Sequence, residues 1–195
     1  MARVNQQDLP SRLIDEAARL LSELGPGGLS LRKVAAACGV STMPVYTLFG
    51  DKQGLLRAMH QEGFRRLGAQ LEAVHPTGDP LGDLLALGFA YRNAALASPH
   101  LYGLMFGQVP EEVSPDPEAR EAADATYRPL VEAVTRCQQS GTFQGASDPE
   151  RIALHLWAVA HGMVNLEFNE QLPPAGTPEH LFREALNFAV FPFLA

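Results

Sequence analysis

Hydrophobic residues recur along the chain at the spacing of one-sided helices. Over residues 11–24, Ile14, Ala17, Leu21 and Leu24 return every three or four positions, which is typical of a helix with one buried face. No segment alternates convincingly as a strand would. We therefore predict an all-α protein of about nine helices, over residues 11–24, 31–38, 42–49, 51–74, 80–97, 99–106, 117–139, 149–171 and 178–193.

The predicted boundaries depend on residues that start or stop helices. Residues 25–28 (Gly-Pro-Gly-Gly) should end the first helix and Gly39 the second, while Ser30 and Ser41 are expected N-caps. Five later helices share one start signal, a capping side chain before a proline in the first turn, at Asp79-Pro80, Ser98-Pro99, Asp116-Pro117, Asp148-Pro149 and Thr177-Pro178. Residues 108–115 are expected to form an exposed loop.

The composition favours a folded protein. Of 195 residues, 46% are hydrophobic and 19% charged, which is too apolar for a disordered chain. No apolar run reaches the roughly 18 residues of a membrane span, and the polar opening predicts no secretory leader. Cys38 and Cys137 lie far apart, and the histidines lack a metal-binding spacing. We expect a soluble, cytoplasmic protein with no disulfide, metal or other cofactor.

The net charge of −7 conceals an asymmetry along the chain. Residues 1–75 carry nine Lys or Arg against seven Asp or Glu, a balance of +2, whereas the remaining 120 residues have a balance of −9. Both lysines, Lys33 and Lys52, fall in the first part. This asymmetry favours a polyanionic partner for the first part only.

Residues 31–50 have the spacing of a helix-turn-helix, in which the second helix lies in a DNA major groove. The outward side chains at the start of that helix include no acidic residue, so they can approach a duplex without repulsion. With the nearby basic residues, the candidate DNA contacts are Arg32, Lys33, Ser41, Thr42, Met43, Pro44, Tyr46, Thr47 and Lys52. The alternative is a structural three-helix bundle with solvated basic residues.

The segment Gly39-Val40-Ser41-x-x-x-Val45-Tyr46-x-x-Phe49-x-x-Lys52-x-x-Leu55-Leu56 resembles the core of the tetracycline-repressor (TetR) family of transcriptional regulators, and the likeness extends over 11–71. The resemblance implies that Arg32 and residues 41–44 contact bases, and that Tyr46 and Lys52 contact phosphates. One position departs, since Leu48 stands where the family usually has His or Tyr. We expect a DNA-binding domain over 8–71, and a ligand-binding and dimerisation domain over 76–195.

Two C-terminal helices, over about 149–171 and 178–193, are apolar on more than one side. A surface helix of a monomer needs only one apolar stripe. We therefore expect each helix to bury one face internally and another against a second copy. A two-fold dimer would present two recognition helices to a palindromic operator, and the family resemblance implies the same dimer.

Aromatic and soft side chains of the middle helices are candidates for binding a small hydrophobic molecule, although any one of them could be ordinary core. They are Phe89, Tyr91, Tyr102, Met105, Phe106, Tyr127, Trp157 and His161. Through Trp157-x-x-x-His161-Gly162, this half resembles the TetR branch that is named for its Trp-His-Gly residues. His161 could donate to a ligand or simply to a backbone carbonyl.

The sequence therefore predicts a dimeric transcriptional regulator that binds double-stranded operator DNA and is released by a small hydrophobic effector. We expect it to repress transcription rather than activate it. One alternative is a helical protein-interaction module that has lost operator binding. An enzyme is the other alternative, but the chain offers no nucleophile–base pair and no Gly-rich phosphate loop, so we predict no catalytic residues.

Overall fold

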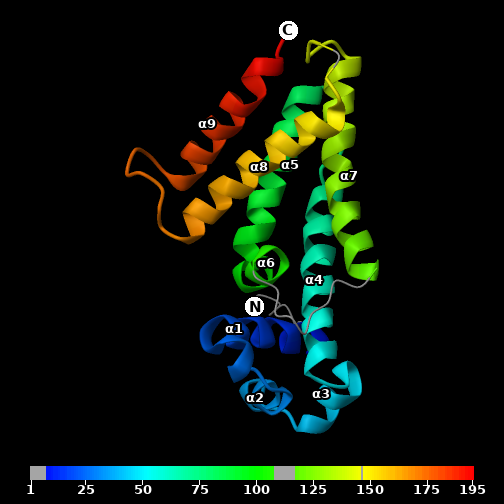
Figure 1. Ribbon diagram of the computed structural model, residues 1–195, viewed down its shortest axis with the longest axis vertical. Coiled ribbons are helices and arrows are strands. Elements are labelled where there is room, and N and C mark those ends of the chain that lie inside the picture. The colour runs from blue at the N-terminus through cyan, green and yellow to red at the C-terminus, as the bar shows by residue number, and fades with distance from the viewer. Residues whose placement is uncertain (1–7, 108–116, 146) are drawn as a thin grey trace, which may run out of the picture. The chain divides into compact units, whose positions relative to one another are not determined.

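A computed structural model describes residues 8–107, 117–145 and 147–195 (Figure 1). Over these residues the chain forms nine α-helices and no strand, which confirms the predicted all-α fold. The helices are α1 (Leu9–Gly28), α2 (Leu31–Ala37), α3 (Thr42–Phe49), α4 (Lys52–Glu72), α5 (Pro80–Ala97), α6 (Pro99–Phe106), α7 (Pro117–Gln139), α8 (Pro149–Phe168) and α9 (Pro178–Val190). No helix in the described part is long and apolar enough to cross a membrane.

The helix ends differ from prediction in a few places. Gly25 leaves the helical conformation as expected, with φ 68°, but a further helical turn follows and carries α1 to Gly28. The helix predicted over 178–193 ends at Val190, and Phe191–Phe193 forms a 3-10 turn, because Pro192 offers no N–H to continue the α-helix. The predicted loop 108–115 lies outside the described residues.

The chain divides into two compact units that interleave in sequence. Unit 1 comprises Met1–Arg65 and Ser98–Ala122, and unit 2 comprises Arg66–Ala97 and Ala123–Ala195. The boundaries fall inside α4 and α7 and between α5 and α6. Helix α6 therefore belongs to the unit that holds α1–α3, whereas the domain boundaries expected from sequence group it with the C-terminal helices.

Unit 1 is built around one apolar core. Helix α1 packs against α2 and α6, and α2 packs against α3, as Figure 1 shows for the three N-terminal helices. The buried residues of this core are Leu13, Ile14, Ala17, Ala18, Leu20, Leu29, Leu31, Val34, Ala35, Val45, Leu55, Leu56, Met59, Leu101 and Leu104. Asp8 accepts from the Ser11 amide at 3.1 Å and so caps α1, and the predicted N-cap Ser30 accepts from the Lys33 amide at 3.3 Å.

In unit 2, α8 packs against both α5 and α9, and a buried ion pair joins α5 to α8. Arg92 donates from Nε and from a terminal nitrogen to the two carboxylate oxygens of Glu167, at 2.8 and 2.6 Å. The Phe182 ring of α9 lies 5.8 Å from the same guanidinium. Cys137 is fully buried and donates to the Pro80 carbonyl at 3.3 Å, and burial raises the pKa of its thiol to about 11.

Replacing Glu167 with glutamine should destabilise the protein by about 3–5 kcal/mol, because it leaves the Arg92 charge buried without a counter-charge. The double variant Arg92→Met/Glu167→Leu should recover most of that loss, since it removes both charges together. Urea unfolding followed by far-UV circular dichroism measures the difference. Equal stability of Glu167→Gln and wild type would show that the pair does not hold α5 to α8.

Candidate nucleic-acid interface and ligand-binding residues

The turn between α2 and α3 is set by local backbone bonds. Gly39 has φ 68°, a left-handed conformation that glycine adopts cheaply, and the Val40 amide donates to the Ala35 carbonyl at 3.0 Å. The chain thereby passes from α2 to α3 through the four residues 38–41. This is the helix-turn-helix that the sequence predicts.

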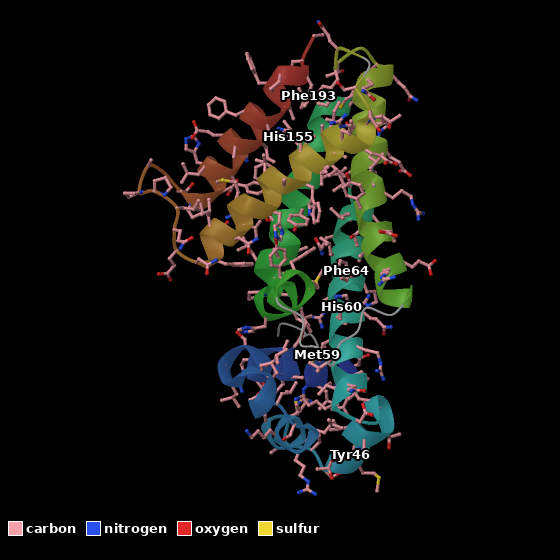
Figure 2. The ribbon with its side chains drawn as sticks, in the orientation of Figure 1. Tyr46, Met59, His60, Phe64, His155 and Phe193 are labelled. Carbon is pink, nitrogen blue, oxygen red and sulfur yellow. The ribbon has the colours of Figure 1, made fainter. Side chains whose placement is uncertain are left out.

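Helix α3 has one buried side chain, Val45, which is completely enclosed. Met43 is 72% exposed, Tyr46 is 46% exposed, and Ser41, Thr42 and Thr47 are also exposed, while Pro44 is partly covered. Figure 2 shows Tyr46 on the outer side of α3. The predicted contact residues of this helix are therefore available to a partner.

Ser41 occupies the N-cap position of α3, but its side chain makes no capping hydrogen bond. The expectation that Ser41 caps α3 is correct in position and wrong in mechanism. Its backbone is extended, with ψ 164°, as is usual for an N-cap residue, but the hydroxyl does not bond to the helix end. The hydroxyl can therefore donate or accept elsewhere.

Both lysines bond to the last turn of α1. Lys33 donates from Nζ to the Gly28 carbonyl, and Lys52, the first residue of α4, to the Pro26 carbonyl, each at 2.7 Å. Carbonyls at the end of a helix have no partner within it, so these amines stabilise the turn. The sequence analysis assigned the lysines to DNA and missed this second role, which basic residues near a Gly-Pro-Gly-Gly helix end could have signalled. Arg32 is exposed on α2.

The eight candidate ligand residues do not form one group. Tyr102, Met105 and Phe106 of α6 lie in unit 1, where the Phe106 ring packs 4.9 Å from Tyr102 and 5.7 Å from Phe64 of α4. Met105 fills the space over Gly63, since a Cβ there would lie 2.5 Å from its sulfur. In Figure 2, His60 and Phe64 project from this part of α4. The three α6 residues pack within unit 1.

Phe89 lies in unit 2, where it contacts α9. Its ring is 5.5 Å from that of Phe182 in an edge-to-face arrangement, and the Arg183 guanidinium lies over it at 4.4 Å. Both contacts help to attach α5 to α9. Phe89 therefore has a packing role of its own.

The remaining four candidates form a continuous cluster in unit 2. Tyr91 Oη is 3.0 Å from His161 Nδ1, and the Trp157 ring lies 5.8 Å from the His161 ring and 6.0 Å from that of Tyr127. Tyr127 also donates to the Glu150 carbonyl at 2.9 Å. Burial lowers the pKa of His161 and so favours the uncharged imidazole. The cluster offers aromatic walls and uncharged polar atoms.

His155 and His161 are six residues apart on α8 and have different surroundings. His155 is exposed, and its ring lies 5.9 Å from that of Phe193; Figure 2 labels both residues. His161 instead contacts Tyr91 and Trp157, so the two histidines occupy different faces of α8. Among the described residues, no three His, Cys, Asp or Glu side chains gather as metal ligands would.

Several apolar side chains of α8, α9 and the 3-10 turn remain uncovered in the single chain. Phe188 is 75% exposed and Phe191 72% exposed, and Leu154 and Leu166 of α8 are exposed as well. Single exposed apolar residues are common on protein surfaces, whereas contiguous apolar patches mark interaction sites. The opposite sides of the same helices are buried through Val164, Leu186 and their neighbours.

Two family models match this chain. The model of the tetR family of bacterial regulatory proteins matches residues 13–59, and that of the tetracyclin repressor-like C-terminal domain matches residues 84–189. None of the curated proteins compared with the chain matches it. The match to the C-terminal model does not test the finer assignment to the Trp-His-Gly branch, which stays a prediction.

Solved structures share the fold over nearly the whole chain. A protein of unknown function from Rhodococcus sp. RHA1 is 30% identical with a TM-score of 0.80, each chain being covered completely. The TetR family transcriptional regulator PfmR from Thermus thermophilus is 20% identical with a TM-score of 0.76, covering 92% of this chain and 97% of its own. The fatty acid degradation regulator FadR from Bacillus halodurans is 17% identical with a TM-score of 0.78, covering 94% and 95%.

The C-terminal match alone spans more than half of the 195 residues, and the N-terminal match covers the helix-turn-helix whose geometry is described above. The chain therefore belongs to the TetR family of transcriptional regulators.

Proposed function

We propose that the protein is a dimeric repressor that binds a palindromic operator through α3 and leaves it when a small hydrophobic effector binds unit 2. The observation that carries this proposal is the exposed first turn of α3, which has no acidic residue and is held by the buried Val45. Such a helix can enter a major groove without electrostatic repulsion. An operator partner implies a cytoplasmic location.

Phosphate contacts from Tyr46 and Lys52, with Arg32 and Lys33 nearby, would fix the register of α3 on the duplex. Lys52 lies at the start of α4, where the helix dipole adds to its positive charge. An ammonium group has three donors, so Lys52 can keep its bond to the Pro26 carbonyl and still donate to a phosphate. The exposure of Arg32, Lys33 and Tyr46 and the positive charge of Lys52 support these roles.

The variant Lys52→Gln should bind operator more weakly and with less dependence on salt. Each phosphate neutralised contributes about 0.9 to the slope of log affinity against log salt concentration. Because a dimer carries two copies of Lys52, the magnitude of this slope should fall by about 2. Duplexes selected from random sequence by the full chain provide the probe, and fluorescence anisotropy the measurement.

The matched control is Arg128→Gln, which removes an exposed cation of α7 and should leave the slope unchanged. Thermal unfolding of both variants separates binding from the structural bond to Pro26. An unchanged slope for Lys52→Gln would assign Lys52 a purely structural role. Failure to select any duplex would favour a protein-interaction module instead.

The proposed dimer interface is the exposed apolar side of α8 and α9. Phe188, Phe191 and Leu154, which are exposed in the single chain, would be covered by the second copy. Burying a phenylalanine side chain stabilises by about 1.5–3 kcal/mol, and each such residue would count twice in a two-fold interface.

Replacing Phe188 with aspartate should convert the dimer to monomer at micromolar concentration, because it places a charge at the centre of the apolar surface. Helicity should stay unchanged, since Phe188 is 75% exposed in the single chain. Sedimentation velocity measures the change, and Leu48→Asp, an exposed apolar residue of α3, is the matched control that should stay dimeric. A dimeric Phe188→Asp would place the interface elsewhere.

The proposed effector contacts are Tyr91, Tyr127, Trp157 and His161, because these side chains lie together and the other four candidates pack with other partners. Their polar atoms are uncharged, which suits a neutral apolar molecule with a hydrogen-bonding group. To release DNA, the effector must bind the DNA-free conformation more tightly than the bound one.

The variant His161→Phe should bind Nile red, a neutral hydrophobic probe, about 2- to 12-fold more weakly, as expected for the loss of one hydrogen bond. Quenching of Trp157, the single tryptophan of the chain, reports the binding. His155→Phe changes an exposed histidine of the same helix and should bind the probe as wild type does. Equal binding by all three proteins would remove His161 from the proposed site.

A further inference from the structure

The outer side of α3 lacks the side chains that most often distinguish bases by paired hydrogen bonds. Ser41 and Thr42–Phe49 include no Arg, Lys, Asn or Gln, the residues that bond in pairs to guanine or adenine. The hydroxyls of Ser41, Thr42 and Thr47 can donate to or accept from several base edges. Hydrogen bonds from this helix therefore give little discrimination by themselves.

The direction of each α3 side chain follows from the position of Val45. Successive residues of an α-helix are separated by about 100°, so Met43 lies about 160° around the helix from the buried Val45, on the side that faces away from the core. Leu48 lies only about 60° from Val45, beside the core-facing side. Met43 is accordingly 72% exposed and Leu48 46%.

Met43 also lies in the first turn of α3, the part of a recognition helix that contacts base edges. Its side chain is long, unbranched and polarisable, and adapts to irregular apolar surfaces. In the major groove, the apolar group that a base pair displays is the 5-methyl group of thymine. An exposed methionine at this position thus complements one base in particular.

We propose that Met43 recognises the methyl group of a thymine in each half of the operator, and so contributes sequence specificity that hydroxyl contacts cannot supply. This inference rests on the proposed function, since it requires α3 to enter the major groove. It adds the contact by which α3 would distinguish a thymine from the other bases.

The test replaces thymine with deoxyuridine, which differs only by the methyl group. Duplexes selected by the full chain are remade with deoxyuridine at one thymine position at a time, symmetrically in both halves, and affinity is measured by fluorescence anisotropy. At one position, the affinity of the wild-type protein should fall about fourfold per methyl group removed, or about sixteenfold when both halves are changed, as expected for a buried methyl-sized group.

Met43→Ala should bind the thymine duplex more weakly and should no longer distinguish it from the deoxyuridine duplex at that position. Leu48→Ala, which shortens an exposed apolar side chain on a different side of α3, should keep the full wild-type discrimination. Because both positions are exposed, neither change should affect folding, and thermal unfolding checks this.

A wild-type protein that binds every deoxyuridine duplex as tightly as its thymine counterpart would overturn the inference, as would an unchanged methyl effect in Met43→Ala or a selected half-site without thymine. In each of these results the protein still binds DNA, so the proposed function survives. If no duplex is selected at all, the proposed function fails as well.

Discussion

The DNA-binding unit depends on the burial of a few aliphatic side chains beneath two helices that are too short to be stable alone. Helices α2 and α3 have seven and eight residues, whereas isolated helices shorter than about 12–15 residues are marginal in water. Leu31 and Val34 hold α2, and Val45 holds α3. The same burial decides which residues face outward, so the surface offered to a duplex is set by the core beneath it.

The two units treat charge differently. In unit 1 the basic residues Arg32 and Lys33 are exposed, and they can attract a polyanion. In unit 2 the buried guanidinium of Arg92 is neutralised by Glu167, and burial favours the neutral form of His161.

Local signals in the sequence predicted local structure well. A capping side chain followed by proline located the starts of α5, α8 and α9, because capping and the fixed φ of proline act within a few residues. Ser98-Pro99 also located the start of α6, although the Ser98 side chain makes no capping hydrogen bond. The exposure of Met43 and Tyr46 followed from the buried position of Val45, since helical periodicity relates them directly. The helix-turn-helix part of the candidate site was thus accessible from the sequence.

Contacts between distant segments were not accessible in that way. Arg92 and Glu167 are separated by 75 positions, and no local pattern connects them. The packing of Phe106 against Phe64, and of Met105 over Gly63, likewise depends on where α6 lies in unit 1. Composition alone gave aromatic residues of the middle helices a common role, although only four of the eight form one cluster.

The bonds from Lys33 and Lys52 to the carbonyls of Gly28 and Pro26 have a consequence for covalent modification. These are the only lysines in the 195-residue sequence. An acyl group on either amine would remove one positive charge and weaken the support of the α1 turn in a single reaction. Acylation of lysine, enzymatic or chemical, would therefore fall on unit 1 alone, and coupling through a lysine to a sensor surface would tether the protein by this unit.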